Sequence, residues 1–311
     1  MARFLIRRLI HALFVVVAIS LVTFLLVRQA GGDPARLVLG AKAPRTAVVT
    51  LRHELGLDRP IHEQYVTWVK GLVTGDMGDS ISNRPSSVSS LIGPRILPSA
   101  LLIGYSLLIA TVVGIPVGIY AAVRKNRLGD HVVRVVATMA FAMPAFWVGL
   151  LLLLLFSLQL TIFPLAGYGS GFIGHLESLT LPAIAVAFSV TPLVIRSVRA
   201  SMLETLSADF VEAAEARGLA RPRILYKHAL RNSILPTITL LGVFIGALLS
   251  LTVVVENVFA IPGLGSLLVS SVQASDFPVI EGLAVLFGVV VVMVNLLTDV
   301  LYVAVDPRVR L

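Results

Sequence analysis

The feature that most constrains this chain is a series of six long apolar runs, five of which contain no Asp, Glu, Lys or Arg. The runs cover residues 9–27, 100–123, 135–163, 179–195, 233–255 and 282–305. Each is long enough for a helix to cross the bilayer core, which takes roughly 17 to 25 residues. Backbone groups in hydrocarbon must pair within the segment, and the runs lack the alternation of barrel strands. We therefore expect an all-α, polytopic membrane protein with six transmembrane helices, the third long enough to break at Pro144.

Composition agrees with a membrane protein, since 57% of the residues are hydrophobic and only 14% are charged. The formal net charge is +8, but its distribution follows membrane topology, so we expect no nucleic-acid partner. The first run is longer than the apolar core of a signal peptide and is followed by Arg28, which predicts an N-terminal transmembrane helix over residues 1–28 that is retained. The chain contains no cysteine, which excludes disulfides and thiolate metal sites.

Lysines and arginines near helix ends favour the cytoplasmic side, and their distribution here is uneven. If the N-terminus is inside, sixteen of the 25 fall on the cytoplasmic side: Arg3, Arg7, Arg8, Arg124, Lys125, Arg127, Arg134, Arg196, Arg199, Arg217, Arg221, Arg223, Lys227, Arg231, Arg308 and Arg310. The two short outer loops, residues 164–178 and 256–281, contain none. Both termini are therefore expected in the cytoplasm, with a cytoplasmic tail at residues 306–311.

The remaining nine basic residues fall between Arg28 and Arg95, and all but Arg28 lie in an external segment, residues 29–97, which is long enough to escape the charge rule. Turn residues divide it into short amphipathic helices, which we expect over residues 45–55 and 60–72. It is too small for a sizeable core of its own, so it serves either as a partner surface or as a packed extension of the bundle. Residues 98–305 are expected to form a core domain of five transmembrane helices.

The cytoplasmic loop at residues 196–236 is expected to fold as a helix-turn-helix. Asp209 can cap a first helix, with Glu212 three positions on, and Gly218 can take the left-handed conformation that ends it. A second helix is expected near Arg221, where Pro222 suits the first turn, and Pro236 marks the entry into the fifth span.

This loop resembles the "EAA" loop by which membrane subunits of ABC importers contact their ATPases. The residues that carry the resemblance are Glu212, Ala213, Ala214, Gly218, Leu235 and Pro236. Further stretches along nearly the whole chain resemble the dipeptide/oligopeptide/nickel importer permeases. They include Gly32-Asp33-Pro34, Gly75-Asp76-Met77-Gly78, Arg199-Ala200-Ser201-Met202, Glu256-Asn257-Val258-Phe259 and the Asp306-Pro307-Arg308 ending.

The resemblance implies the type I ABC importer permease fold and a heteromeric complex in the plasma (inner) membrane of a prokaryote. The implied partners are a second homologous permease subunit, two cytoplasmic ATP-binding subunits, an external solute-binding protein and the lipid bilayer. This chain would form half of the pathway for a peptide or related small solute. It lacks the G-x-x-x-x-G-K-[ST] phosphate loop, so we expect no ATPase site, no catalytic residue and no cofactor here, with ATP and Mg on the partner subunits.

The pathway itself is less clearly marked in the sequence. Candidate lining residues within the spans are Ser189, Thr191, Ser250, Thr252 and Asn295. The same hydroxyls and amides also join helices to one another in membranes, and that alternative stays open for each. A stand-alone channel or ion-coupled carrier is the alternative function, although a carrier would bury more ionisable residues and would not need the EAA-like loop. An intramembrane hydrolase is disfavoured, because Gly167-Tyr168-Gly169-Ser170-Gly171 does not match G-x-S-x-G.

Overall fold

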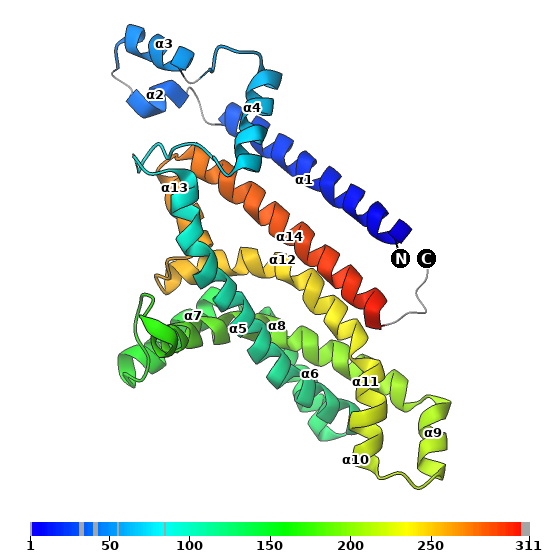
Figure 1. The fold of residues 1–311 in the computed structure, drawn as a ribbon. Helices are drawn as coiled ribbons and strands as arrows, with labels where there is room; N and C mark the ends of the chain where they lie inside the picture. The colour runs from blue at the N-terminus through cyan, green and yellow to red at the C-terminus, as the bar shows by residue number, and fades with distance from the viewer. Residues whose placement is uncertain (1, 31–33, 40–42, 55, 84, 306–311) are drawn as a thin grey trace. The chain divides into compact units, whose positions relative to one another are not determined.

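The computed structural model describes residues 2–30, 34–39, 43–54, 56–83 and 85–305, and there the regular secondary structure is helical, joined by turns and loops, apart from one isolated β-bridge between Asp79 and Ser87 (Figure 1). Five helical segments are long and apolar enough to cross a membrane: Ile6–Gln29, Val88–Val123, Gly171–Leu206, Leu235–Val258 and Phe277–Val300. A bent helix pair between the second and third of these can form a sixth span. The expected all-α membrane fold is confirmed; the expected tail at 306–311 lies outside the described residues.

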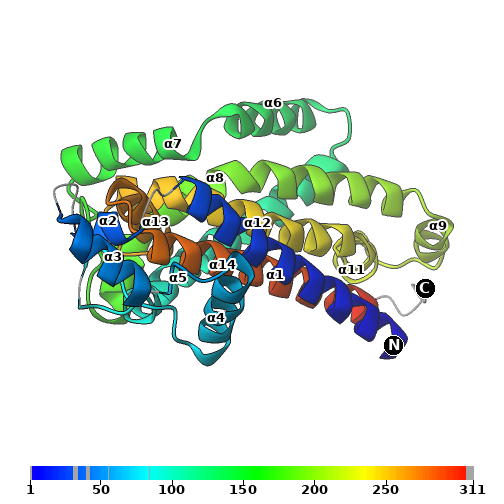
Figure 2. The same ribbon diagram turned by 90° about the horizontal axis from the view of Figure 1, so that it is seen from above.

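The third apolar run breaks at Pro144, as its length and proline predict. Helix α6 (Leu128–Ala142) and helix α7 (Ala145–Leu152), which continues as a π-helical turn, η1 (Leu153–Gln159), meet at a bend of 96°. Figure 2 shows the short connection between α6 and α7. Met143 is extended, with φ −85° and ψ 128°, because the proline ring that follows disfavours the helical conformation.

The chain forms two compact units, the first made of Met1–Pro98 and Pro262–Met293, the second of Ser99–Ile261 and Val294–Leu311. The first unit contains helices α1 (Ala2–Ala30), α2 (Pro34–Leu39), α3 (Arg45–Glu54), α4 (Ile61–Thr74) and α13 (Leu264–Gln273). It also contains the first part of α5 (Val88–Val123) and most of α14 (Phe277–Val305). Helices α2 and α13 were not expected, whereas α3 and α4 fall close to the predicted ranges.

Aromatic side chains join α1 to α4 in the first unit. Phe24 is fully buried, and its ring lies 5.4 Å from that of Tyr65 and 5.5 Å from that of Trp68. The hydroxyls of Ser20 and Tyr65 are 2.8 Å apart, and the Arg28 guanidinium lies over the Phe24 ring at 4.7 Å. Helix α4 is thus attached to the first span by aromatic contacts and by a hydrogen bond.

A buried carboxylate at the start of α14 holds the loop that precedes α5. Asp276 accepts hydrogen bonds from the Ser80 hydroxyl, from the Ile81 N–H at 3.0 Å, and from the hydroxyl and N–H of Ser82 at 2.6 and 3.2 Å. Beside it lies an apolar core built from α5, α13 and α14, made of Val88, Ile92, Leu264, Leu267, Val279 and Leu283. The loop and the three helix segments therefore form one packed structure.

The second unit is organised around α8 (Gly171–Leu206), which packs against α6, α7 and α12 (Leu235–Val258). Glycines allow α5 and α8 to approach closely, since a β-carbon on Gly114 would lie 2.7 Å from Val194 and one on Gly118 would lie 2.8 Å from Val198. Such contacts between small residues and a facing helix are typical of membrane bundles.

Glu256, near the end of α12, has a fully buried side chain. The Ser99 hydroxyl donates a hydrogen bond to its Oε1 at 2.6 Å. A buried carboxylate needs such donors, so within this unit Glu256 joins the start of the α5 segment to α12.

Candidate functional site

The EAA-like loop folds as a hairpin between α8 and α12 (Figure 1). Its first arm is α9 (Asp209–Ala216). The second arm begins with α10 (Arg221–Arg223), passes through a π-helical turn, η2 (Ile224–Ala229), and ends in α11 (Leu230–Ser233). Pro222 lies in the first turn of α10, where its missing N–H costs nothing. The expected helix-turn-helix is present.

The start of α9 differs from the expectation. Ala208 is the N-cap, and no side chain caps the helix, so the predicted capping role of Asp209 is wrong. Asp209 and Glu212 instead both lie in the first turn, where a negative charge interacts favourably with the helix dipole. The expected N-cap was one residue too late in the chain, because Asp209 is itself the first helical residue and Ala208 precedes it.

Gly218 ends α9 in a Schellman motif. Its φ is +74°, a conformation open to glycine and costly for most other residues. The Gly218 N–H donates to the Glu215 carbonyl at 2.9 Å, and the Leu219 N–H donates to the Ala214 carbonyl at 3.2 Å. These two bonds define the motif, and Leu219 packs against the apolar cluster that contains Ala214. The glycine therefore fixes the angle at which the second arm leaves the first.

The two arms are held together by a small apolar cluster. Val211, Ala214 and Ile224 are buried, and Leu219 packs against them. Glu212 and Ala213 lie on the other face of α9 and are exposed. Of the three residues in the Glu-Ala-Ala stretch, Ala214 thus holds the hairpin together and the other two are open to a partner. Leu219 and Ile224 were not singled out in the sequence, although an apolar residue directly after a helix-ending glycine is a usable signal.

The hairpin leads directly into the membrane helix that follows. Only Ile234 separates α11 from α12, which begins at Leu235, and Pro236 occupies its first turn. The Ile238 N–H donates to the Ile234 carbonyl at 3.0 Å, so helical hydrogen bonding resumes at once. A displacement of the second arm would therefore be transmitted to α12 through a short and well-bonded connection.

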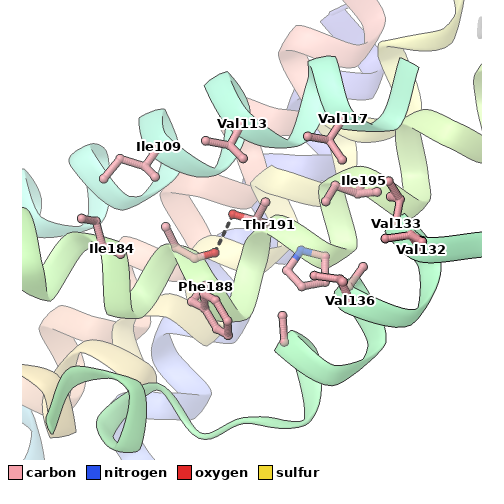
Figure 3. Close-up of a pocket in the computed structure, with 14 residues that line it drawn as sticks. Ile109, Val113, Val117, Val132, Val133, Val136, Ile184, Phe188, Thr191 and Ile195 are labelled. Atoms are coloured by element: carbon pink, nitrogen blue, oxygen red, sulfur yellow. Dashed lines mark hydrogen bonds between the residues drawn. The ribbon is translucent and has the colours of Figure 1, made fainter. Parts of the chain in front are cut away.

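The second unit also contains an apolar cavity of about 460 Å³ between α5, α6 and α8 (Figure 3). Its lining includes Val113 and Val117 from α5, Val136 from α6, and Phe188 from α8. Thr191 is the one polar residue in the lining, and its hydroxyl donates to the Ala187 carbonyl at 2.7 Å. The cavity thus presents hydrocarbon, with no polar group directed to bind a peptide.

The other four candidate pathway residues lie apart from this cavity's lining. Ser189 on α8 is half-buried, and Thr252 on α12 is buried with its hydroxyl bonded to the Leu249 carbonyl at 3.0 Å. Ser250 on α12 and Asn295 on α14 are exposed on this chain. Thr191 and Thr252 thus bond within their own helices, whereas Ser250 and Asn295 are on surfaces open to lipid or to another subunit.

Two family descriptions match the chain. Residues 114–311 match the binding-protein-dependent transport system inner membrane component, and residues 1–89 match the N-terminal part of the membrane component of such systems. The glutathione transport system permease protein GsiC of Escherichia coli strain K12 is 36% identical, over 100% of this chain and 99% of that protein. The protein named "Probable D,D-dipeptide transport system permease protein DdpB", from the same strain, is 39% identical over 95% of this chain and 94% of its own length.

A solved structure of the MetNI methionine ABC transporter, in an inward-facing conformation, shares the fold. Its matching chain aligns with a TM-score of 0.58 at 16% identity, over 70% of this chain and 96% of that one. At that identity the likeness concerns the fold alone. Together with the helical spans and the hairpin, these matches establish that the chain belongs to the family of inner membrane components of binding-protein-dependent transport systems, the permease subunits of ABC importers.

Proposed function

We propose that this subunit forms half of the membrane pathway of an importer for peptides or related small solutes. Support for the cargo class comes from the relatives, whose names refer to glutathione and to D,D-dipeptides. Cargo recognition would rest mainly with the external solute-binding protein. We keep Ser189, Thr191, Ser250, Thr252 and Asn295 as candidate pathway residues, with the two exposed ones, Ser250 and Asn295, directed to the space shared with the second permease subunit.

The observation that carries the proposed mechanism is the hairpin closed at Gly218 and continuous with α12. We infer that the exposed face of α9, with Glu212 and Ala213, docks on a cytoplasmic ATP-binding subunit. Closure of two such subunits on ATP would push the hairpin and tilt α12 through Leu235 and Pro236. A rigid-body motion outside the membrane would thereby open and close the pathway.

The remaining parts of the proposal concern assembly. The complex would contain a second homologous permease subunit and two ATP-binding subunits, with ATP and Mg bound there and no ATPase site in this chain. Both termini and the hairpin would face the cytoplasm, because the basic residues of the short loops gather on that side.

The docking role is tested by changing Gly218 in the assembled complex. A β-carbon at Gly218 meets no atom within 4 Å, so a substitution acts through the backbone conformation and not through a clash. Gly218→Val disfavours the left-handed turn, whereas Gly218→Asn tolerates it and is the matched control. In proteoliposomes with all subunits, we expect Gly218→Val to lower transport per ATP hydrolysed about tenfold, from a backbone cost of roughly 1–2 kcal/mol, and Gly218→Asn to stay near wild type.

A charge reversal on the exposed face, Glu212→Lys, should likewise uncouple transport from ATP hydrolysis while the protein still inserts. Wild-type uptake by both Gly218→Val and Glu212→Lys would contradict the docking role. Uptake by this chain alone, without ATP-binding subunits, would favour a stand-alone channel or ion-coupled carrier.

A further inference from the structure

A buried ion pair joins α6 to α8 in the second unit. Asp130, in the first turn of α6, is fully buried, while the Arg199 side chain on α8 is 19% exposed. Arg199 donates twice, from Nε to Oδ1 at 2.6 Å and from Nη2 to Oδ2 at 2.7 Å. The backbone N–H of Asn126 donates to Oδ2 at 3.0 Å. Such two-pronged pairing fixes both distance and orientation between the two helices.

The rest of the α6–α8 contact is less restrictive. The 460 Å³ cavity opens between these helices and α5, and its lining from α6 and α8 is aliphatic or aromatic except for Thr191 (Figure 3). Apolar contacts have no preferred direction, so they orient two helices less strictly than a two-pronged hydrogen-bonded pair does. The Asp130–Arg199 pair is therefore a directional contact between α6 and α8.

Arg199 also lies close in sequence to the hairpin. Helix α8 ends at Leu206, and only Ser207 and Ala208 separate it from α9. The end of α8 contacts the second arm as well, since η2 and α11 both pack against it. Leu203 and Leu206 of α8 face Val211 and Ile224 of the hairpin across a cavity of about 260 Å³. A displacement of the hairpin would thus act on α8 as well as on α12.

We propose that Asp130 and Arg199 are positioning residues that form a second transmission route, in which α8 carries the movement of the hairpin to α6 through their ion pair. The proposal rests on the proposed coupling function and adds to it. The first route enters the bundle through α12. The second would move the bent α6–α7 span together with α8, so that both sides of α8 respond to one docking event.

The test compares two arginines that face the same carboxylate. Arg134 Nε lies 3.6 Å from Asp130 Oδ1, and its side chain is 47% exposed. Arg199→Lys keeps the charge but loses the fork, and Asp130→Asn keeps the shape but loses the charge. In complexes reconstituted with their ATP-binding subunits and binding protein, both changes should lower solute moved per ATP about threefold or more, with ATPase activity retained. Arg134→Lys, the matched control, should stay near wild type.

A second measurement covers the case in which these variants assemble poorly. Asp130→Leu/Arg199→Met replaces the ion pair by apolar side chains, so that no charge is left buried without a partner and the complex can still assemble. The assembled double variant should hydrolyse ATP and move less solute per ATP, because apolar contacts do not fix the orientation of α6 against α8. Wild-type coupling in this assembled variant, or in both Asp130→Asn and Arg199→Lys, would overturn the proposal. If the wild-type complex itself shows no ATP-driven uptake of peptide, the proposed function fails instead.

Discussion

At the scale of single residues, Asp276 shows how the loop before α5 is ordered. Its carboxylate accepts four hydrogen bonds from residues 80–82, nearly two hundred positions earlier in the chain. We predict that Asp276→Asn costs about 2 kcal/mol of local stability, because hydrogen bonds to a charged acceptor are worth about 1.5–3 kcal/mol. Hydrogen exchange of the Ile81 and Ser82 amides in the purified protein would measure it. Asp79→Asn, an exposed neighbour, is the control and should leave exchange unchanged.

The same site predicts a pH dependence. Burial by itself raises the pKa of Asp276, but the hydrogen bonds from Ser80, Ser82 and Ile81 outweigh it, so its pKa lies below the ordinary value of 3.8. A carboxylate whose pKa is lowered in the folded state stabilises it above the unfolded-state pKa and loses that contribution as the pH falls through the folded value. The Ile81 and Ser82 amides should therefore stay protected from exchange at pH 6 and lose protection once the pH is lower than about 4. Equal protection at pH 6 and at the lower pH would contradict this account.

Two other residue contacts have the same non-local character. Asp130 and Arg199 are 69 positions apart, and a β-carbon on Gly242 of α12 would overlap Thr298 of α14. No periodicity or motif around these positions indicates the pairing, because each partner looks like an ordinary helix residue in its own stretch. From the sequence, Arg199 was counted among the basic residues expected on the cytoplasmic side, and its ion pair with Asp130 was not predicted. By contrast, Gly218 and Pro144 act on their own backbone, and their effects could be predicted.

At the scale of helices, the length of an uncharged apolar run predicts that a transmembrane helix is present. It predicts the two ends of that helix poorly. Helix α5 begins at Val88, although its uncharged run begins at residue 100, and α8 continues to Leu206, past the run that ends at residue 195. Polar and basic turns extend these helices because neighbouring segments pack on them. Helix α13, Leu264–Gln273, is too short to register as a span and was taken for a loop. It is held by the packing of Leu264 and Leu267 in the core of its unit.

The hairpin depends on few contacts, which makes it sensitive as an element. Ile224 is 2% exposed and packs against Val211 and Ala214, whereas Tyr226, two residues later, is 63% exposed. We predict that Ile224→Ala costs about 2 kcal/mol or more and loosens the two arms, since the apolar cluster is small. Limited proteolysis of the purified subunit should then cut within residues 207–234 sooner, while Tyr226→Ala should leave the rate unchanged. Similar cleavage rates for both variants would show that the cluster does not hold the hairpin.

At the scale of the whole molecule, function depends on which side of the membrane each connection faces. The order of spans follows from the sequence, and the contacts that complete each of the two units do not, because they join segments far apart in the chain. The orientation rests on the positive charges of the short loops, and an inverted orientation would place the hairpin out of reach of any cytoplasmic ATP-binding subunit. The proposed docking site and the proposed transmission route therefore both require the hairpin to face the cytoplasm.

The absence of cysteine allows this orientation to be measured with single substitutions. Ser170, before α8, and Arg217, beside the hairpin turn, are both exposed, so a cysteine at either position can react with a thiol reagent. A membrane-impermeant maleimide should label Ser170→Cys in intact cells and Arg217→Cys only after the membrane is opened. Ser20→Cys, buried between α1 and α4, is the negative control and should stay unlabelled in both conditions. Labelling of Arg217→Cys in intact cells would reverse the topology and remove the hairpin from the side on which ATP is hydrolysed.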